Sequence, residues 1–246
     1  MADSSKEIGA GRVTFLTEEQ KRRIYDTALG ILDEIGMEVL HEEAEQVMLD
    51  GGCTRDADGK VHVPAAVVEQ ARESVPASFM VYDRAGDPAM SLGRHNSYFG
   101  TGSDLMSTYD LETGERRQSV LADVARAARL CDALPNIDFV MSCAHPNDIE
   151  PGRSYLESFK AMVMNTTKPM VMTSEHAGDL AVMCAVAEEL RGGSEELAAK
   201  PYFIMYLEPV SPLSHPVESI AKLLFCADHG IPAIYSPAPL AGGTAP

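Results

Sequence analysis

The sequence predicts an α/β fold in which short parallel strands alternate with helices, and it favours the first part of a (β/α)8 TIM-type barrel. From about residue 96, apolar runs typical of strands alternate with helix-like stretches every roughly 30 to 40 residues. No strand-to-helix turn carries the G-x-G-x-x-G spacing of a dinucleotide-binding sheet. Polar side chains follow each apolar run, as expected where barrel strands share one rim.

Residues 1–95 lack this alternation and predict a mixed α+β N-terminal elaboration. The first helix begins after Thr17, because Thr17 and Gln20 have the spacing of a capping box, and it ends at Gly36. Further on we expect a helix over 42–49, a strand over 60–63, a helix over 64–74 and a strand over 79–82.

Residues 96–246 predict five strand–helix units. The strands are expected at 97–100, 137–143, 170–173, 202–207 and 233–235, with helices at 120–134, 155–165, 179–190 and 217–229. A hairpin between residues 105 and 118 precedes the first of these helices. Because a closed barrel needs eight units, we expect an incomplete barrel that stops at Pro246.

Composition excludes several classes of protein. The net charge is −17, from 37 acidic and 20 basic residues, which disfavours nucleic acid as a partner. No apolar run is long enough to span a membrane, and the N-terminus lacks the apolar stretch of a signal peptide. The five cysteines form no Cys-x-x-Cys pair, so we expect a reducing, cytoplasmic location.

Three carboxylates, Asp104, Glu175 and Glu208, follow expected strands and would reach the rim. Converging there, they could neutralise a cation or exchange protons. Glu208 is best placed, because Pro209 keeps the following residues out of a helix. The alternative is that each carboxylate caps a helix or pairs with a neighbouring Lys or Arg.

Aromatic and imidazole side chains are expected at the same rim as these carboxylates. Tyr98, Tyr206 and Tyr235 could hold a quaternary ammonium by cation–π attraction, or simply fill the barrel interior. The loop histidines are His145, His176 and His215. They share no metal-ligand spacing, so we expect substrate contacts and no bound metal. No nucleophile motif is present.

Several motifs are similar to those of one family, in order along nearly the whole chain. They are the segments 98–104 (YFGTGSD), 110–117 (DLETGERR), 168–173 (KPMVMT), 208–213 (EPVSPL) and 236–246 (SPAPLAGGTAP). In these segments the chain resembles the trimethylamine methyltransferase family.

The resemblance implies a (β/α)8 barrel roughly twice this length. It also implies transfer of a methyl group from a methylated amine, trimethylamine or a quaternary amine such as glycine betaine, to the Co(I) of a corrinoid protein. Members serve methanogenesis, and some contain pyrrolysine. The corrinoid cofactor would then be carried by the partner protein, with none held tightly by this chain.

With this chemistry, the catalytic candidates are Glu208, Asp104 and His145. The expected substrate-binding residues are Tyr206, Tyr235, Tyr98 and Glu175. Two alternatives stay open: a metal-dependent barrel hydrolase, and an inactive truncated fragment. Open parallel strand edges would in either case favour a homo-oligomer.

Overall fold

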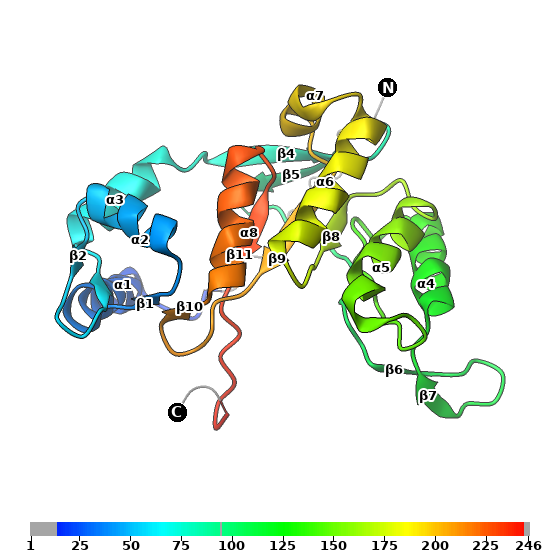
Figure 1. Cartoon of the computed structure of the whole chain (residues 1–246), viewed down its shortest axis with the longest axis horizontal. Coiled ribbons are helices and arrows are strands. Elements are labelled where there is room, and N and C mark those ends of the chain that lie inside the picture. Colours follow the sequence, from blue (N-terminus) through cyan, green and yellow to red (C-terminus); the bar gives the residue numbers. More distant parts are fainter. Residues whose placement is uncertain (1–13, 94, 244–246) are drawn as a thin grey trace. The chain divides into compact units, whose positions relative to one another are not determined.

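The computed structural model describes residues 14–93 and 95–243, which form a mixed α/β structure (Figure 1). The chain divides into two compact units. The first unit runs to Ala77 and also includes Pro212–His215, and the second comprises Ser78–Ser211 and the chain from Pro216 onward. None of the helices in the described part is both long and apolar enough to cross a membrane.

The first unit surrounds a small core of Cys53, Val61 and Val63. Its elements are α1 (Glu18–Gly30), η1 (Ile31–Ile35), β1 (Glu38–Val39), α2 (Glu42–Asp50), β2 (Thr54–Arg55), β3 (Val61–His62) and α3 (Ala65–Ser74). The expected capping box is confirmed, since Thr17 accepts from the Gln20 N–H and the Gln20 side chain accepts from Thr17. At its end the helix widens into a π-helical turn, η1, which the sequence did not predict.

A segment far along the chain completes this first unit. This segment contributes β10 (Ser214–His215), which pairs in parallel with β1 and sets Ser214 opposite Glu38. Leu213, directly before β10, adopts a φ of 53°, a conformation rare for residues other than glycine. The sequence pattern predicted only a rim loop at this point.

The second unit contains most of the elements. They are β4 (Ser78–Tyr82), β5 (Pro88–Gly93), β6 (Ser107–Tyr109), β7 (Arg116–Gln118), α4 (Leu121–Ala133), η2 (Pro151–Arg153), α5 (Ser154–Val163), β8 (Met170–Met172), α6 (Ala177–Arg191), α7 (Ser194–Ala199), β9 (Phe203–Leu207), α8 (Val217–Asp228) and β11 (Ala233–Tyr235). The expected hairpin and four expected helices are present within a few residues of their predicted bounds. Strand β5 and helix α7 were not predicted.

The parallel strands of this unit follow one another in space in the order of the sequence. Strands β8, β9 and β11 form a parallel sheet with β9 in the centre. The expected strands over 97–100 and 137–143 are present only as isolated parallel bridges, which extend this order from Met170 to Val140 and from Phe139 to Gly100. A doubly wound sheet reverses its strand order, whereas a barrel does not. The described strands do not close into a barrel.

The two faces of this sheet are covered by different elements. Met170, Met172, Phe203 and Met205 point into the larger core together with buried side chains of α4, α5, α6 and α8. Alternate residues face the other way, where Val171 and Ile204 pack against Val81 and Met90 of the β4–β5 hairpin. The hairpin therefore belongs to the second unit, and the domain boundary near residue 95 stays a prediction.

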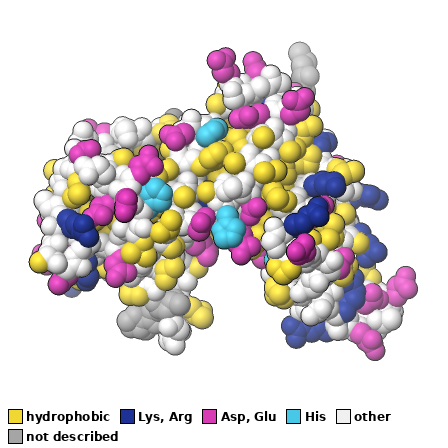
Figure 2. All heavy atoms as spheres, in the orientation of Figure 1, with side chains coloured by type: hydrophobic (Ala, Val, Ile, Leu, Met, Phe, Trp, Pro, Cys, Tyr) yellow, Lys and Arg dark blue, Asp and Glu magenta, His cyan; other side chains and the backbone are white. Residues whose placement is uncertain are grey.

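Charge is unevenly spread over the surface. On the face drawn in Figure 2, Lys and Arg gather over α4 and α5, while acidic side chains are scattered over both units. Several of the basic residues are already paired: Arg126 with Asp123, and Arg153 with Glu157. On this face, the acidic character expected from the composition is therefore spread over both units, and the basic cluster over α4 and α5 is the exception.

Candidate functional site

Asp104 connects the ends of three successive strand segments. Its Oδ1 accepts from the Ser142 hydroxyl at 3.4 Å, and its Oδ2 accepts from the Thr173 hydroxyl at 3.2 Å. The Asp104 N–H in turn donates to Ser142 Oγ at 3.2 Å. Ser142 is buried. Residues from the loops after the first, second and third segments thus meet at one carboxylate, which supports the expected convergence of strand ends.

The loops around Asp104 hold an uncommon backbone conformation. Asp104 has a φ of 60° and Cys143 a φ of 58°, both in the left-handed region. The Thr101 hydroxyl ties these loops together, since it accepts from the Met141 N–H at 2.7 Å and lies 3.2 Å from the Met141 carbonyl. Non-glycine residues in this region cost free energy and concentrate at functional sites.

Tyr155, in the first turn of α5, lies near this carboxylate. Burial raises the pKa of its hydroxyl, and the charges of Asp104 and Glu175 raise that pKa further. Its ring meets the ring of His145 edge-on, with 5.6 Å between the centroids. Tyr155 was not among the residues expected at the site, because it fell within a predicted helix. Its hydroxyl is thus within electrostatic reach of the two carboxylates, while its ring packs against the larger core.

Tyr206 and Glu208 form a second pair at the end of β9. The Tyr206 hydroxyl donates to Glu208 Oε1 at 2.6 Å, and this bond, then burial and the Glu208 charge, raises the pKa of Tyr206. Met205 pairs with Met172 of β8. Continuing this register by one residue sets Thr173 beside Tyr206 on the same face. The pair therefore adjoins the strand end that reaches Asp104.

Two of the expected tyrosines lie elsewhere. The Tyr98 hydroxyl accepts from the Ser91 N–H of β5 at 2.9 Å, so the hairpin engages it. Tyr235 is paired with Leu207, which faces the helices, and it packs on that larger core. Tyr206 points to the opposite face of the sheet. Tyr98 packs with Tyr206 against the smaller cluster on that face, whereas Tyr235 packs against the larger core.

The loop histidines are dispersed. The His176 ring lies 3.8 Å from Glu175 and 3.7 Å from Glu218, while His145 contacts Tyr155. His215 is part of β10 in the first unit, where burial lowers its pKa. Among the described residues, no group of three or more His, Cys, Asp or Glu side chains is arranged to hold a metal ion.

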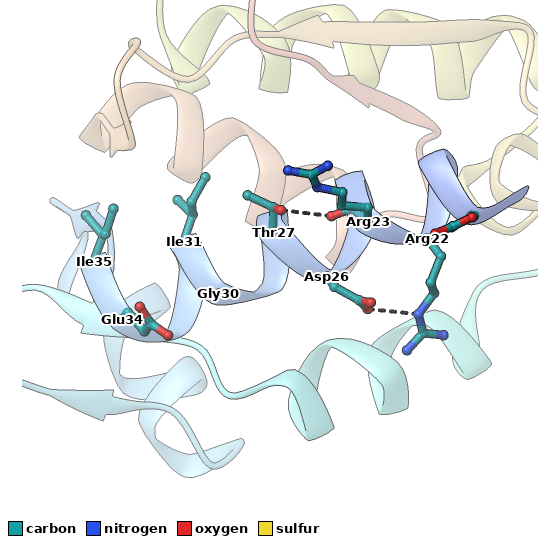
Figure 3. A pocket seen from close by; sticks show the side chains of 9 residues that line it. Arg22, Arg23, Asp26, Thr27, Gly30, Ile31, Glu34 and Ile35 are labelled. Carbon is teal, nitrogen blue, oxygen red and sulfur yellow. Dashed lines mark hydrogen bonds and ion pairs between the residues drawn. The ribbon is translucent and has the colours of Figure 1, made fainter. Parts of the chain in front are cut away.

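A hollow of about 750 Å³ lies on the first unit, along α1 and η1 (Figure 3). Its walls include the ion pair of Arg22 with Asp26, 2.8 Å apart, and the side chains of Ile31 and Ile35. None of the expected site residues lines it. Arg22 and Asp26 are exposed and paired with each other, and no expected site residue lines the hollow, so we do not place the functional site there.

The strand ends can accommodate a small cation. Carboxylates of Asp104, Glu175 and Glu208 can neutralise a positive charge, and the ring of Tyr206, on the face of the sheet opposite the larger core, can present a π face to it. The Glu175 side chain is half-exposed, and Glu208, also predicted as a site residue, is exposed. These groups are suited to binding and positioning a small cation.

The chain is similar to known proteins along nearly its whole length. The family model described as trimethylamine methyltransferase (MTTB) matches residues 4–246. A glycine betaine methyltransferase of Desulfitobacterium hafniense is 27% identical over 237 residues, covering 96% of this chain and 49% of that protein. A trimethylamine methyltransferase MttB of Methanosarcina barkeri is 29% identical over 239 residues, covering 94% and 48%. The chain thus spans about half the length of these curated relatives.

Proposed function

The chain belongs to the trimethylamine methyltransferase family, and we propose that its strand ends bind a methylated amine whose methyl group passes to the Co(I) of a corrinoid protein. The observation that carries this proposal is the meeting of Asp104, Ser142 and Thr173 from three strand ends, with Tyr155 beside them. The negative charge gathered at these strand ends supports the binding of a small cation.

The fold belongs to the same proposal. We infer that the second unit supplies the first five βα units of a (β/α)8 barrel. The parallel segments are in sequence order, the helices cover one face, and the β4–β5 hairpin packs on the face that would be the barrel interior. The polar strand ends then form part of the rim that carries the active site in such barrels.

The chemistry requires little covalent participation by this chain. When bound, the corrinoid of the partner protein would supply the nucleophile for the methyl group, and the amine would leave with the electrons of its C–N bond. The chain's own residues would bind, orient and partly desolvate the ammonium. Tyr206, held by its 2.6 Å bond to Glu208, presents a fixed ring to the substrate.

The charges favour a substrate that is a simple cation. Glycine betaine carries its own carboxylate, which would face Asp104, Glu175 and Glu208. The buried ammonium of Lys222 near these residues donates to backbone carbonyls of Ser174 and Glu175. This supports trimethylamine over glycine betaine as the substrate.

The test uses the present protein, expressed from its native gene, and measures how fast the corrinoid protein is methylated. Glu208→Gln and Tyr206→Ala should each lower the rate at subsaturating trimethylamine at least about tenfold, the effect of removing one charged hydrogen bond or one cation–π contact. Tyr109→Ala, at an exposed tyrosine of β6, is the matched control and should retain the full rate. Unchanged rates in the first two variants would contradict the assignment of this site.

A further inference from the structure

Lys222 of α8 is buried, yet no carboxylate of the described residues lies at ion-pair distance from its ammonium. It donates to the Ser174 carbonyl at 2.7 Å and to the Glu175 carbonyl at 3.3 Å. Burial lowers the pKa of Lys222, opposed by the charges of Glu218 and Asp179. A buried ammonium is costly unless its donors are used, so the loop after β8 is held against α8 by these bonds.

Glu218 contacts the same loop with the opposite polarity. It lies one helical turn before Lys222, on the same face of α8. Its Oε2 accepts from the Ala177 N–H at 3.1 Å and lies 3.7 Å from His176 Nδ1. The segment after β8 thus accepts hydrogen bonds from the Lys222 ammonium through its carbonyls and donates one to the Glu218 carboxylate through a backbone N–H. Both side chains belong to α8.

Ser219 extends these contacts to the next loop. Its hydroxyl donates to the Glu208 carbonyl at 2.8 Å. Glu208 follows β9 and accepts from Tyr206. One face of α8 therefore touches the loops that carry Glu175 and Glu208.

We propose that Glu218, Ser219 and Lys222, named here the α8 clamp, are positioning residues that fix the loops after β8 and β9 relative to each other. They act through backbone groups, so their own side chains need not touch the substrate. The clamp sets where Thr173 and Glu175 stand relative to Glu208. Its role in amine binding rests on the function proposed above, whereas its effect on the loops does not.

Hydrogen exchange of the full chain, followed by mass spectrometry, tests the clamp directly. Lys222→Met keeps the length of the side chain but removes the donor, and should speed exchange across residues 174–177 about tenfold, as for loss of one charged hydrogen bond. The matched control is Lys168→Met. Lys168 also donates to backbone carbonyls, those of Cys131, Leu134 and Ile137, but at the end of α4.

The control should leave residues 174–177 unchanged even if it destabilises the chain. Ser219→Ala should speed exchange near Glu208 and spare residues 174–177. Equal exchange of residues 174–177 in the Lys222 and Lys168 variants would overturn the clamp.

Calorimetric titration with trimethylamine separates the clamp from the proposed function. Lys222→Met should weaken binding about tenfold, and Lys168→Met should leave it unchanged. Equal weakening in both variants would mean general destabilisation and would refute positioning. If the unmodified chain binds no trimethylamine while Lys222→Met still loosens the loop, the proposed function fails and the clamp stands.

Discussion

Asp104 gains its position from contacts that are distant in the sequence. Ser142 and Thr173 donate to its two carboxylate oxygens, and the backbone is held at a φ of 60°. Aspartate tolerates this conformation better than most residues. Its charge acts on Tyr155, whose pKa is raised first by burial and then by Asp104 and Glu175.

This coupling can be measured. Asp104→Asn removes the charge but keeps a similar shape, so the pKa of Tyr155 should fall toward its ordinary value while burial keeps it raised. Ultraviolet titration, with Tyr155→Phe subtracted to isolate this tyrosine, measures the shift. Asp148→Asn, which changes an aspartate outside this cluster, should leave the titration unchanged. A Tyr155 pKa that does not move in Asp104→Asn would show that the carboxylate lies farther away.

The first unit contains a pH-sensitive pair. His62 Nε2 lies 3.0 Å from Asp56 Oδ2, and His62 Nδ1 lies 2.6 Å from the Asp33 carbonyl oxygen. Because both ring nitrogens face acceptors, the charged imidazolium satisfies both. The bond to Asp56, then the bond to Asp33, raises the pKa of His62, and the bond to His62 lowers the pKa of Asp56.

Stability should therefore depend on pH in a defined way. The raised His62 pKa contributes stability that is complete below about pH 6.5 and is lost as pH rises through the folded-state pKa. The lowered Asp56 pKa contributes stability above about pH 4, which is lost as pH falls through its folded-state value. Melting temperatures of His62→Gln should vary less with pH than those of the unmodified chain. His95→Gln, at an exposed histidine, should not alter the profile.

At the scale of elements, Gly100 sets how closely the first two strand segments approach. A Cβ placed on Gly100 would lie 2.4 Å from a ring carbon of Phe139, its partner in the parallel bridge. Only glycine fits this contact without displacement of the ring or the backbone. Close packing of these two segments therefore explains why a glycine stands at position 100, which the sequence predicted to lie in a strand.

Gly100→Ala should lower the free energy of unfolding by about 1 to 3 kcal/mol, the usual cost of overpacking. Adding Phe139→Leu should restore part of this loss, since it removes the ring atoms that meet the new methyl group. Urea denaturation of the single and double variants measures both effects. An unchanged unfolding midpoint in Gly100→Ala would mean that the two segments are farther apart.

At the scale of the molecule, the sheet of the second unit has open edges. β11 pairs with β9 on one side, and no strand borders its other side among the described residues. An unpaired strand edge offers backbone groups to another chain. We therefore expect this chain to self-associate, and light scattering after size-exclusion chromatography measures it.

A charge on that edge should oppose association. Ala233→Lys places an ammonium on β11 and should shift the population toward the monomer. Ala122→Lys, at an exposed alanine of α4, adds the same charge away from the edge and should not. A chain that is already monomeric at high concentration would contradict the expectation of a homo-oligomer.

The sequence predicted the helices and strands that have strong local signals. The capping box at Thr17 and the apolar runs of β8 and β9 are local patterns, and the structure confirms them. It did not predict β10, because two residues carry no periodicity and their partner, β1, is distant in the sequence. It gave Tyr155 no role, since a tyrosine at the start of a helix has no signal that distinguishes packing from binding.

The sequence by itself determined the alternation of strands and helices, the polar residues at the strand ends and the family to which the chain belongs. These are properties of spacing and residue type, which act over a few positions. Only the tertiary structure decided which of those residues meet. Asp104 meets Thr173 across 69 positions and Lys222 meets Ser174 across 48, whereas Tyr235 turns toward the helices. Contacts of that separation depend on strand register, which a single sequence does not specify.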